Sequence, residues 1–453
     1  MRRRTFIKDT AITGAGLSLV NPVFTIQNKF YRKDKLRLGF IGVGARGLGT
    51  LELALYRDDI VVTAVCDIDA SHAKQAHKMV VDAGQPAPAL FTKGNMDYKN
   101  LLDSKLVDAV FICTPWEWHT PMSVDAMNAR VAVACEVAGA ASIEECWQVV
   151  RTQEATRTPF MIMENVCYRR DVMAVLNMVR QNVFGELIHL EGGYQHDLRE
   201  VKFNDGKQYY GGGVEFGEKG YSEARWRTQH SVYRNGDLYP THGIGPVAHY
   251  ININRGNRFT TLTSMASKAR GLHDYVVSHP AGGKEHPNTK IQFKLGDVVT
   301  TSIQTANGET IVLSHDTNLP RPYSLGFRVQ GTKGIWMDVN KSIYIEGKSP
   351  AHRWEPAEPY IKEYDHPLWK KYEQNAANAG HGGMDWFVMH AFIEALKNGD
   401  PMPMDAYDHA SWSAITVLSE KSIAIGGAPQ AFPDFTSGSW INRKPIFALG
   451  DSY

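Results

Sequence analysis

Three glycines and one acid near the beginning of the chain have the types and the spacing of a dinucleotide-binding site. Gly42, Gly44 and Gly47 follow an apolar run that starts at Leu36, and Asp67 ends the next apolar run, 25 residues after Gly42. Glycines at this spacing let the backbone approach a pyrophosphate at a helix N-terminus, and the acid accepts hydrogen bonds from ribose hydroxyls. No arginine follows Asp67 directly, so the pattern predicts NAD rather than NADP. The alternative is a glycine-rich turn in another doubly wound fold.

Groups that could contact a ligand or transfer a proton follow several other apolar runs. They are Trp116, Glu117, Trp118 and His119; Glu136 and Val137; Glu164 and Asn165; Tyr194 and His196; Tyr239 and His242; and Tyr323. The carboxyl ends of parallel strands form the ligand crevice of doubly wound folds, so we expect the segment at 114–119 to line it. Tyr239 and His242 are one helical turn apart and could face one site. Each of these residue types is also common in structural positions, and the two tryptophans could simply pack a loop.

The elements that must position these groups alternate between strand and helix from residue 36 to about 165. The expected strands are 36–42, 60–66, 89–92, 107–113, 131–137 and 159–164. The fourth and fifth are continuous apolar runs, which suits a parallel sheet covered on both faces. Ser142, with Glu145 three residues on, predicts the start of a helix over 142–156. This alternation predicts a Rossmann-type doubly wound domain of the α/β class.

The pattern changes after residue 185. Alternating runs at 260–267, 297–305, 309–315 and 327–330 predict antiparallel strands, and helical patterns return at 384–397 and 406–424. We therefore expect an α+β domain with an open, mainly antiparallel sheet. The polar stretch 199–238 is too long for an idle connection and predicts a loop that shapes the site. The expected division is a signal and linker at 1–33, an NAD-binding domain at 34–166 and a substrate domain at 167–453, whose last helices could pack back on the first domain.

Composition excludes some functions and leaves others open. Lys+Arg 49 against Asp+Glu 48 gives almost no net charge, which argues against nucleic acid or an anionic membrane surface as a partner. The five cysteines have an odd count and spacing that fits neither a metal site nor a disulfide framework, so we interpret them as buried apolar residues. No metal is expected, and a homo-oligomer is compatible with the sequence.

The first residues resemble an export signal. Arg3-Arg4-Thr-Phe-Ile-Lys8 is similar to a twin-arginine motif, and a mildly apolar stretch at 11–23 follows it. That stretch is too short and too polar to predict a membrane span. The twin-arginine route exports folded proteins, often with their cofactor in place, so we expect a periplasmic protein. The alternative is a basic tail without a targeting role.

Beyond single residues, whole segments resemble a known family. The dinucleotide fingerprint with a glutamate after the fifth strand is similar to the Gfo/Idh/MocA oxidoreductase superfamily. Within it, the chain from about residue 35 to its end resembles glycoside hydrolase family 109, the NAD-dependent α-N-acetylgalactosaminidases. The segments that carry this likeness are 116–119, 164–170, 193–197, 213–218, 239–242 and the Gly-His-Gly-Gly-Met run at 380–384. One departure from the superfamily is Val137, because many of its dehydrogenases have Glu-Lys-Pro where this chain has Glu136-Val137-Ala138.

The resemblance implies a role for particular residues. It assigns NAD contacts to the glycine turn with Ala45 and Arg46, to Asp67, and to Trp116, Glu117, Trp118, His119, Glu136, Val137 and Asn165. It assigns sugar contacts to Tyr194, Arg227, Tyr239, Pro240, Thr241, His242 and Tyr323. Proton transfer is associated with Glu164, His196, Tyr239 and His242, without a fixed division of acid and base roles.

The implied reaction is hydrolysis without net oxidation or reduction. A hydride passes from carbon 3 of the terminal sugar to NAD, and the resulting ketone acidifies the hydrogen on carbon 2. A base removes that hydrogen, the glycosidic bond breaks by elimination, water adds at carbon 1, and the hydride returns. The substrate would be a glycan or glycoconjugate with terminal α-N-acetylgalactosamine. Two alternatives stay open at this point: an exported NAD-dependent sugar dehydrogenase, which releases NADH, and a non-catalytic sugar-binding protein with structural NAD.

Overall fold

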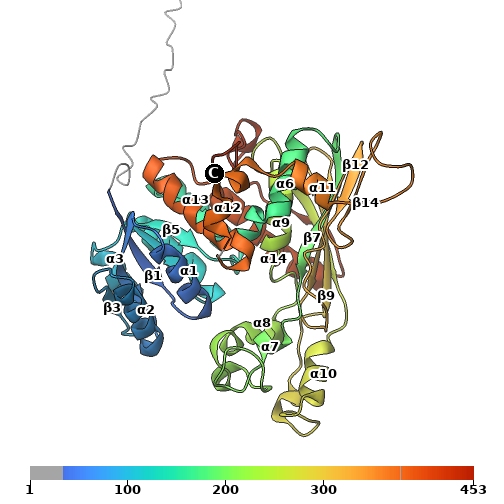
Figure 1. The fold of residues 1–453 in the computed structure, drawn as a ribbon. Coiled ribbons are helices and arrows are strands. Elements are labelled where there is room, and N and C mark those ends of the chain that lie inside the picture. Colours follow the sequence, from blue (N-terminus) through green and yellow to red (C-terminus); the bar gives the residue numbers. More distant parts are fainter. Residues whose placement is uncertain (1–33, 378) are drawn as a thin grey trace, which may run out of the picture.

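The computed structural model describes residues 34–377 and 379–453, which form two domains on either side of a cavity (Figure 1). The predicted export signal at 1–33 lies outside the described residues. Within the described part of the chain, no helix is both long enough and apolar enough to cross a membrane.

The first domain is the doubly wound sheet that the alternating pattern predicts. Its six parallel strands lie in the order β3-β2-β1-β4-β5-β6. They are β1 (Leu36–Ile41), β2 (Ile60–Cys66), β3 (Ala89–Phe91), β4 (Ala109–Ile112), β5 (Ala132–Cys135) and β6 (Phe160–Ile162). The strand order reverses between β1 and β4, and a ligand crevice forms at such a switch point. The glycine turn follows β1 and the tryptophan segment follows β4, so both lie at this crevice.

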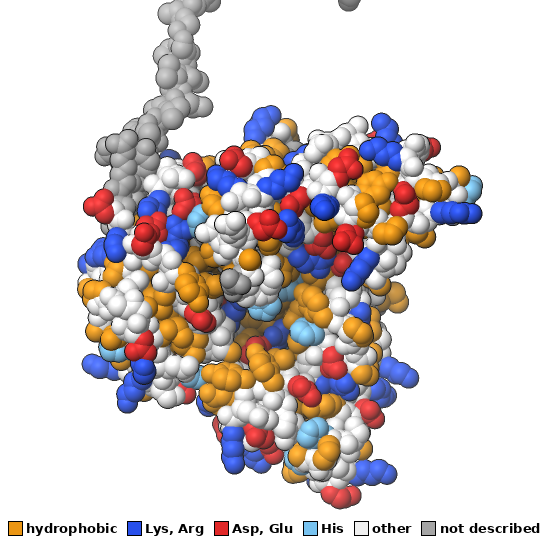
Figure 2. Space-filling view, viewed as in Figure 1, with side chains coloured by type: hydrophobic (Ala, Val, Ile, Leu, Met, Phe, Trp, Pro, Cys, Tyr) orange, Lys and Arg blue, Asp and Glu red, His pale blue; other side chains and the backbone are white. Residues whose placement is uncertain are grey.

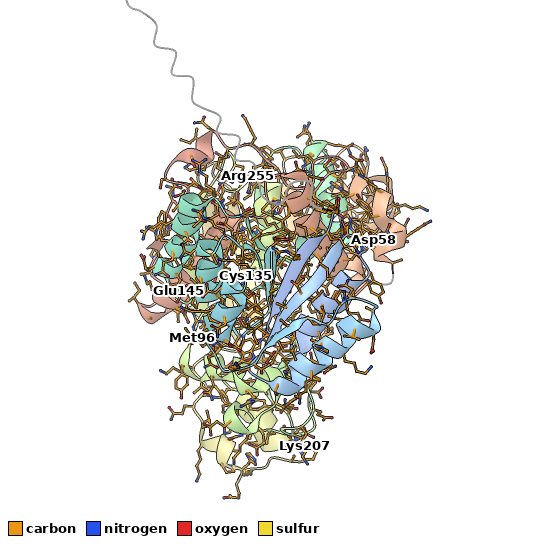
Figure 3. The ribbon with its side chains drawn as sticks, turned by 90° about the vertical axis from the view of Figure 1, so that its left-hand side faces the viewer. Asp58, Met96, Cys135, Glu145, Lys207 and Arg255 are labelled. Atoms are coloured by element: carbon orange, nitrogen blue, oxygen red, sulfur yellow. The ribbon has the colours of Figure 1, made fainter. Side chains whose placement is uncertain are left out.

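The helices of this domain connect successive strands. They are α1 (Ala45–Leu55), α2 (Ala70–Asp82), α3 (Asp97–Asp103), α4 (His119–Asn128) and α5 (Ile143–Thr156). The cap predicted for α5 is present, because the Ser142 hydroxyl accepts from the Glu145 amide at 3.1 Å. The Glu145 carboxylate in turn accepts from the Ala141 amide at 2.7 Å. Figure 3 looks onto this domain, with Cys135 at the end of β5.

The second domain contains a nine-stranded, mainly antiparallel sheet in the order β14-β13-β12-β11-β7-β10-β9-β8-β15, as the fold class predicts. Only its β7–β10 pair is parallel. The strands are β7 (Leu187–Gln195), β8 (Phe259–Ala266), β9 (Val298–Thr305), β10 (Thr310–Asp316), β11 (Arg328–Gly331), β12 (Gly334–Met337), β13 (Ser342–Ile345), β14 (Glu355–Pro356) and β15 (Gln430–Ala431). Along β9, buried Val299, Thr301 and Ile303 alternate with exposed residues, so only one face joins the core.

Helices cover that buried face and close the cavity. The helices of this domain are α6 (Arg170–Arg180), α7 (Arg199–Lys202), α8 (Arg227–Tyr233), α9 (Thr241–Tyr250), α10 (Gly271–Ser278), α11 (Glu358–Glu363), α12 (Pro367–Ala376), α13 (Met384–Asn398) and α14 (Ala406–Ala424). α9 packs on β7, α14 packs on β8 and on α5, and α13 packs on α1 of the first domain. α13 also contacts β4 of the first domain, where the ring centroids of Phe392 and Phe111 are 5.4 Å apart. The C-terminal helices therefore join the two domains.

The polar stretch 199–238 is not a bare loop but carries α7, α8 and two short 3-10 turns. It forms part of the lobe at the bottom of Figure 1, together with α10. A small separate core of Phe203, Val214, Leu272 and Val276 holds this lobe together. We call residues 199–238 the roof segment, because several of its side chains line the cavity.

Candidate active site

A cavity of about 1400 Å³ lies between the first domain, the sheet of the second domain and the roof segment. Figure 2 shows the hollow in the middle of the molecular face, with histidine and basic side chains inside it. Most of the predicted site residues line this cavity: Gly42, Gly44, Ala45, Arg46, Asp67, Trp116, Glu117, Trp118, Glu136, Val137, Asn165, Tyr194, His196, Arg227, Tyr239, His242 and Tyr323. The fold therefore brings together segments that are more than 200 residues apart in the sequence.

The glycine turn has the geometry that a pyrophosphate site requires. Gly42 has φ of +82°, and a Cβ there would lie 2.8 Å from the Cys113 carbonyl oxygen. A Cβ at Gly47 would lie 2.0 Å from the Gly42 carbonyl oxygen. α1 begins after Gly44 with no side-chain cap and no acid in its first turn, so its free amides suit an anion. The turn and the helix end therefore fit a dinucleotide.

Asp67 is tied to this turn through its backbone. One carboxylate oxygen accepts from the Val43 amide at 2.8 Å, and the other accepts from the Asp69 amide at 2.8 Å. The carboxylate is thus held at the end of β2, beside the glycine turn, where the ribose acid of such sites is expected.

Arg46 connects the glycine turn to the second domain. Its Nε donates to Glu136 at 2.7 Å, and its two terminal nitrogens donate to Asp385 at 2.8 and 3.0 Å. Asp385 also accepts from the Asn165 amide nitrogen at 2.6 Å. Although burial raises it, hydrogen bonds from His381 and Arg46 lower the pKa of Asp385 well below its usual range. This network fixes the ends of β5 and β6 against the start of α13.

His381 lies above this network at the start of α13. Its Nδ1 is 2.6 Å from an Asp385 carboxylate oxygen, and this hydrogen bond raises the pKa of His381. Gly382 and Gly383 follow with φ of +66° and +95°, a conformation that glycine adopts without strain. The imidazole lines the cavity and its side chain is 65% exposed, so it can reach a bound ligand while protonated.

His242 forms a second histidine–carboxylate pair, with Glu164. The His242 Nδ1 lies 2.8 and 3.0 Å from the two carboxylate oxygens of Glu164, which is fully buried. Glu164 also accepts from the Val166 amide at 3.1 Å. Because a carboxylate only accepts hydrogen bonds, Nδ1 is the protonated nitrogen in neutral His242. Nε2 is then the basic nitrogen, as general-base chemistry requires.

Glycines bring His242 close to the sheet. A Cβ at Gly243 would lie 2.3 Å from the Gly193 amide nitrogen, and one at Gly192 would lie 2.7 Å from the Gly243 carbonyl oxygen. The first turn of α9 therefore touches the backbone of β7. This close approach sets the His242 ring 5.2 Å from the Tyr194 ring of β7, measured between centroids.

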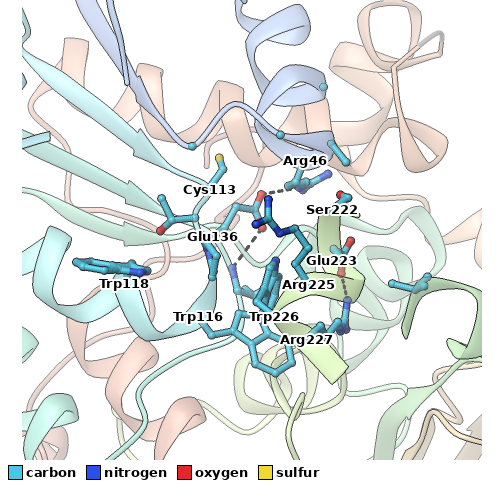
Figure 4. A pocket seen from close by; sticks show the side chains of 18 of the residues that line it. Arg46, Cys113, Trp116, Trp118, Glu136, Ser222, Glu223, Arg225, Trp226 and Arg227 are labelled. Carbon is cyan, nitrogen blue, oxygen red and sulfur yellow. Dashed lines mark hydrogen bonds and ion pairs between the residues drawn. The ribbon is translucent and has the colours of Figure 1, made fainter. Parts of the chain in front are cut away.

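Aromatic rings form the wall opposite Arg46 (Figure 4). Tyr239 stacks on Tyr194 at a centroid distance of 4.5 Å, and the Arg227 guanidinium lies 5.1 Å from the Tyr239 ring. Burial raises the pKa of both tyrosines, so they stay neutral and can donate hydrogen bonds. Trp116 and Trp226 meet edge to face at 5.1 Å. An aromatic wall with polar edges suits a sugar ring.

His196 and Tyr323 line the cavity next to this aromatic wall. The Tyr194 hydroxyl is 3.2 Å from the His196 Nδ1, and the His196 ring lies 4.9 Å from that of Tyr323. Burial lowers the pKa of His196, so this imidazole is neutral near pH 7. Tyr323 is 49% exposed and lies at the rim.

Five predicted site residues do not line the cavity. Gly47 packs against the Gly42 carbonyl oxygen inside the turn, and Glu164 lies behind His242, away from the cavity. Pro240 and buried Thr241 begin α9 and orient their neighbours. His119 is 1% exposed, and its ring nitrogens lie 2.8 Å from the carbonyl oxygens of Ala138 and Thr114. The His119 ring therefore holds two loops together, and its contact with the cofactor stays a prediction.

The sequence reasoning missed several residues that line the cavity. Asp385, His381, Glu223 and Trp226 were not among the predicted contacts, although the Gly-His-Gly-Gly-Met run at 380–384 had been singled out as a family segment. The glycines around His381, directly before a predicted helix, are the feature of the sequence that could have identified it as a site residue. Glu223 is found only through the fold, because it forms an ion pair with Arg227 one helical turn on. Although burial opposes it, this ion pair raises the pKa of Arg227.

The cysteines agree with their predicted role as apolar residues. All five are unpaired; four are buried, and Cys113 is partly buried at the cavity. Among residues 34–377 and 379–453, no group of three or more His, Cys, Asp or Glu side chains is arranged to hold a metal ion.

Comparison with known structures shows the fold. A levoglucosan dehydrogenase in complex with NADH and levoglucosan superposes with a TM-score of 0.62 at 17% identity, over 88% of this chain and 100% of that one. A myo-inositol 2-dehydrogenase from Lactobacillus plantarum gives a TM-score of 0.60 at 14% identity, with the same coverage. Both are dehydrogenases, and the likeness extends across both domains.

Comparison with known sequences shows the family. Residues 36–163 match the oxidoreductase family with an NAD-binding Rossmann fold, and residues 168–442 match the glycosyl hydrolase 109 C-terminal domain. A glycosyl hydrolase family 109 protein of Stenotrophomonas maltophilia (strain K279a) is 57% identical over 100% of this chain and 99% of its own length. An alpha-N-acetylgalactosaminidase of Tannerella forsythia is 50% identical over 99% of both chains. The chain therefore belongs to glycoside hydrolase family 109, and it is an NAD-dependent glycoside hydrolase on a Gfo/Idh/MocA oxidoreductase fold.

Proposed function

We propose that the enzyme removes terminal α-N-acetylgalactosamine from glycans or glycoconjugates by oxidation, elimination, addition and reduction on one sugar. The observation that carries this proposal is the pair of histidine–carboxylate contacts, His242–Glu164 and His381–Asp385, in the cavity beside the glycine turn. Bound NAD supplies a reversible hydride acceptor for carbon 3 of that sugar. The relative from Tannerella forsythia, an alpha-N-acetylgalactosaminidase, supports the choice of sugar.

His242 is the base for the hydrogen on carbon 2. Its Nδ1 is occupied by Glu164, so Nε2 carries the lone pair, and both α9 and buried Glu164 hold the ring in place. Tyr239 and Tyr194, both neutral, donate hydrogen bonds to oxygens of the sugar. The Arg227 guanidinium packs against the Tyr239 ring and stays charged.

His381 is the acid for the glycosidic oxygen. The contact with Asp385 raises the pKa of His381 and so favours its protonated form, and its exposed position at the cavity lets it give a proton to the departing group. The same residue, once neutral, can take a proton from the water that adds at carbon 1. Val137 offers no ionisable group, so the site lacks the lysine that dehydrogenases with Glu-Lys-Pro have at this position.

Cleavage assays with nitrophenyl glycosides test the proposal. The purified enzyme should cleave the α-N-acetylgalactosaminide without added cofactor, and in deuterated water the product should carry deuterium at carbon 2. His242→Ala and Tyr239→Phe should lose most turnover, about 10²–10⁴-fold, while keeping bound NAD and a normal melting curve. No cleavage of any glycoside in the panel, or a fully active His242 variant, would refute the assignment.

We also propose export by the twin-arginine route to the periplasm. Support comes from Arg3-Arg4-Thr-Phe-Ile-Lys8 and the apolar stretch at 11–23. The variant with Arg3→Lys and Arg4→Lys should stay in the cytoplasm and remain active. Unchanged fractionation of this variant would show that the segment is not such a signal.

A further inference from the structure

The roof segment contains a turn that reaches across the cavity to the first domain. The turn consists of Tyr221 and the 3-10 element η4 (Ser222–Arg225), and we call it the roof turn. Tyr221, Ser222, Glu223 and Arg225 all line the cavity, and Figure 4 shows the last three beside the pocket that Arg46 also lines. The roof turn belongs to the second domain, whereas the glycine turn belongs to the first.

A side-chain contact fastens the roof turn to the first domain. The Tyr221 hydroxyl lies 3.2 Å from the Nε2 of His72, which projects from α2. The other ring nitrogen of His72 is 4.0 Å from a carboxylate oxygen of Asp67. His72 therefore lies between the ribose acid and the roof turn. Asn204 anchors the other side, because its side chain accepts from the Tyr221 amide at 3.0 Å and donates to the Tyr221 carbonyl at 2.8 Å.

The roof turn also carries a cation that no protein group neutralises. Three arginines line the cavity: Arg46 is paired with Glu136 and Asp385, and Arg227 is paired with Glu223. Arg225 is exposed and has no ion pair in the described part of the chain. Figure 4 shows its side chain extending from the roof turn into the pocket. An anion bound here would find this charge available.

The bound dinucleotide contains such an anion. A pyrophosphate carries two negative charges, and the free amides of α1 supply only about half an elementary charge. Arg46 is already shared between two carboxylates, so the glycine turn has no spare cation of its own. A guanidinium matches phosphate oxygens through paired hydrogen bonds. Arg225 is thus the cavity arginine that is chemically suited to this group.

We propose that the roof turn is a clasp over the bound NAD, with Arg225 binding the pyrophosphate and the Tyr221–His72 contact holding the turn closed. The clasp joins the two domains across the cofactor, so NAD can leave only after this contact opens. The inference depends on NAD binding and not on which glycoside the enzyme cleaves.

The test is the rate at which NAD leaves the protein. Enzyme saturated with NAD is desalted rapidly, and the dinucleotide still bound is measured over time after denaturation of samples. Arg225→Gln should release NAD about three- to tenfold faster at low salt. This effect is smaller than that of a buried charge-assisted hydrogen bond, because solvent weakens a charge pair at an exposed site. The difference from wild type should shrink as ionic strength rises, because salt screens an exposed cation. Tyr221→Phe should release NAD about two- to tenfold faster.

Matched variants separate the clasp from general effects. Lys219→Gln removes a positive charge from the same segment, outside the cavity lining, and Tyr233→Phe removes a hydroxyl from an exposed position at the end of α8. Both should release NAD at the wild-type rate, and all four variants should keep the wild-type melting temperature. His72→Ala alone removes the same contact from the side of the first domain. The double variant, with His72→Ala and Tyr221→Phe, should release NAD no faster than the faster of the two single variants, because both side chains act through one contact. Release from Arg225→Gln no faster than from Lys219→Gln, or from Tyr221→Phe no faster than from Tyr233→Phe, would overturn the proposal.

Discussion

Replacing Glu164 by glutamine removes the negative charge behind His242 and leaves the shape of the side chain unchanged. The carboxylate is 0% exposed and holds the imidazole with both oxygens, at 2.8 and 3.0 Å from Nδ1. An amide has one oxygen and one NH₂ group, so it can accept from Nδ1–H or donate to a bare Nδ1. In the second arrangement the ring proton moves to Nε2, and His242 loses the lone pair that faces the cavity.

The two arrangements set the size of the effect. If the amide oxygen faces Nδ1, a neutral hydrogen bond replaces a charge-assisted one, which costs about 1–1.5 kcal/mol, or about 5- to 12-fold in kcat. If the amide nitrogen faces Nδ1, the loss is that of the base itself, about 10²–10⁴-fold. We therefore expect Glu164→Gln to lower kcat at least about fivefold. KM and bound NAD should change little, because Glu164 does not line the cavity.

The assay combines turnover with proton exchange. Steady-state kinetics on the nitrophenyl α-N-acetylgalactosaminide give kcat and KM, and product formed in deuterated water reports removal of the carbon 2 hydrogen. Asp97→Asn is the matched control, because Asp97 is 5% exposed and hydrogen-bonded but does not line the cavity. It should keep wild-type kinetics. A folded Glu164→Gln enzyme with kcat within threefold of wild type would refute the claim that Glu164 orients the base.

Three further predictions concern the cofactor, pH and the domain contact. Asp67→Ala should lower NAD retention about tenfold or more in a desalting assay, because the carboxylate is lost along with its bond to the Val43 amide. Asp385→Asn should move the basic limb of the pH–kcat profile to lower pH. Asp385 raises the pKa of His381, so without this carboxylate His381 loses its proton at a lower pH. Although burial raises it, hydrogen bonds from Arg57 and Lys397 lower the pKa of Asp59 to about 2. Asp59→Asn should therefore cost about 1–2 kcal/mol of unfolding free energy in urea at pH 7, and the difference should shrink as pH falls from about 4 towards 2. A constant difference across that range would contradict the ion-pair explanation.

The first domain was predictable because its signals are local. Each strand from β1 to β6 is an apolar run ending in a turn residue, and the cap at Ser142 is a four-residue pattern. The glycine turn was predictable for the same reason, because Gly42 needs a positive φ and Gly47 needs to lack a Cβ whatever the rest of the chain does. A residue type that the local backbone conformation requires can therefore be recognised from the sequence alone.

The cavity wall from the second domain was less predictable, because its residues act through contacts distant in sequence. The Arg46–Asp385 ion pair joins positions 339 residues apart, and neither residue type is unusual where it stands. The short strands β12 to β15 were missed, since runs of two to four residues carry little periodicity. His119 shows the converse, because it stands in a family segment beside two tryptophans that line the cavity, yet its nitrogens face backbone carbonyls.

The carboxylates nearest the two histidines are held in contacts that suit a cofactor-dependent reaction better than hydrolysis by paired carboxylates. Hydrolysis by paired carboxylates requires two carboxyl groups free to act at the anomeric carbon. Here Glu136 and Asp385 are both bonded to Arg46, Glu223 is bonded to Arg227, and Glu164 is buried behind His242. What the sugar side of the cavity offers instead is histidines and neutral tyrosines, which move protons near pH 7 but cannot stabilise a glycosyl cation as a carboxylate does. In the proposed reaction these groups remove an acidic hydrogen from carbon 2, and oxidation at carbon 3 would supply that acidity. On this proposal the glycine turn and the two histidine–carboxylate pairs serve one reaction: the bound dinucleotide makes the hydrogen on carbon 2 acidic, and the histidines move the protons.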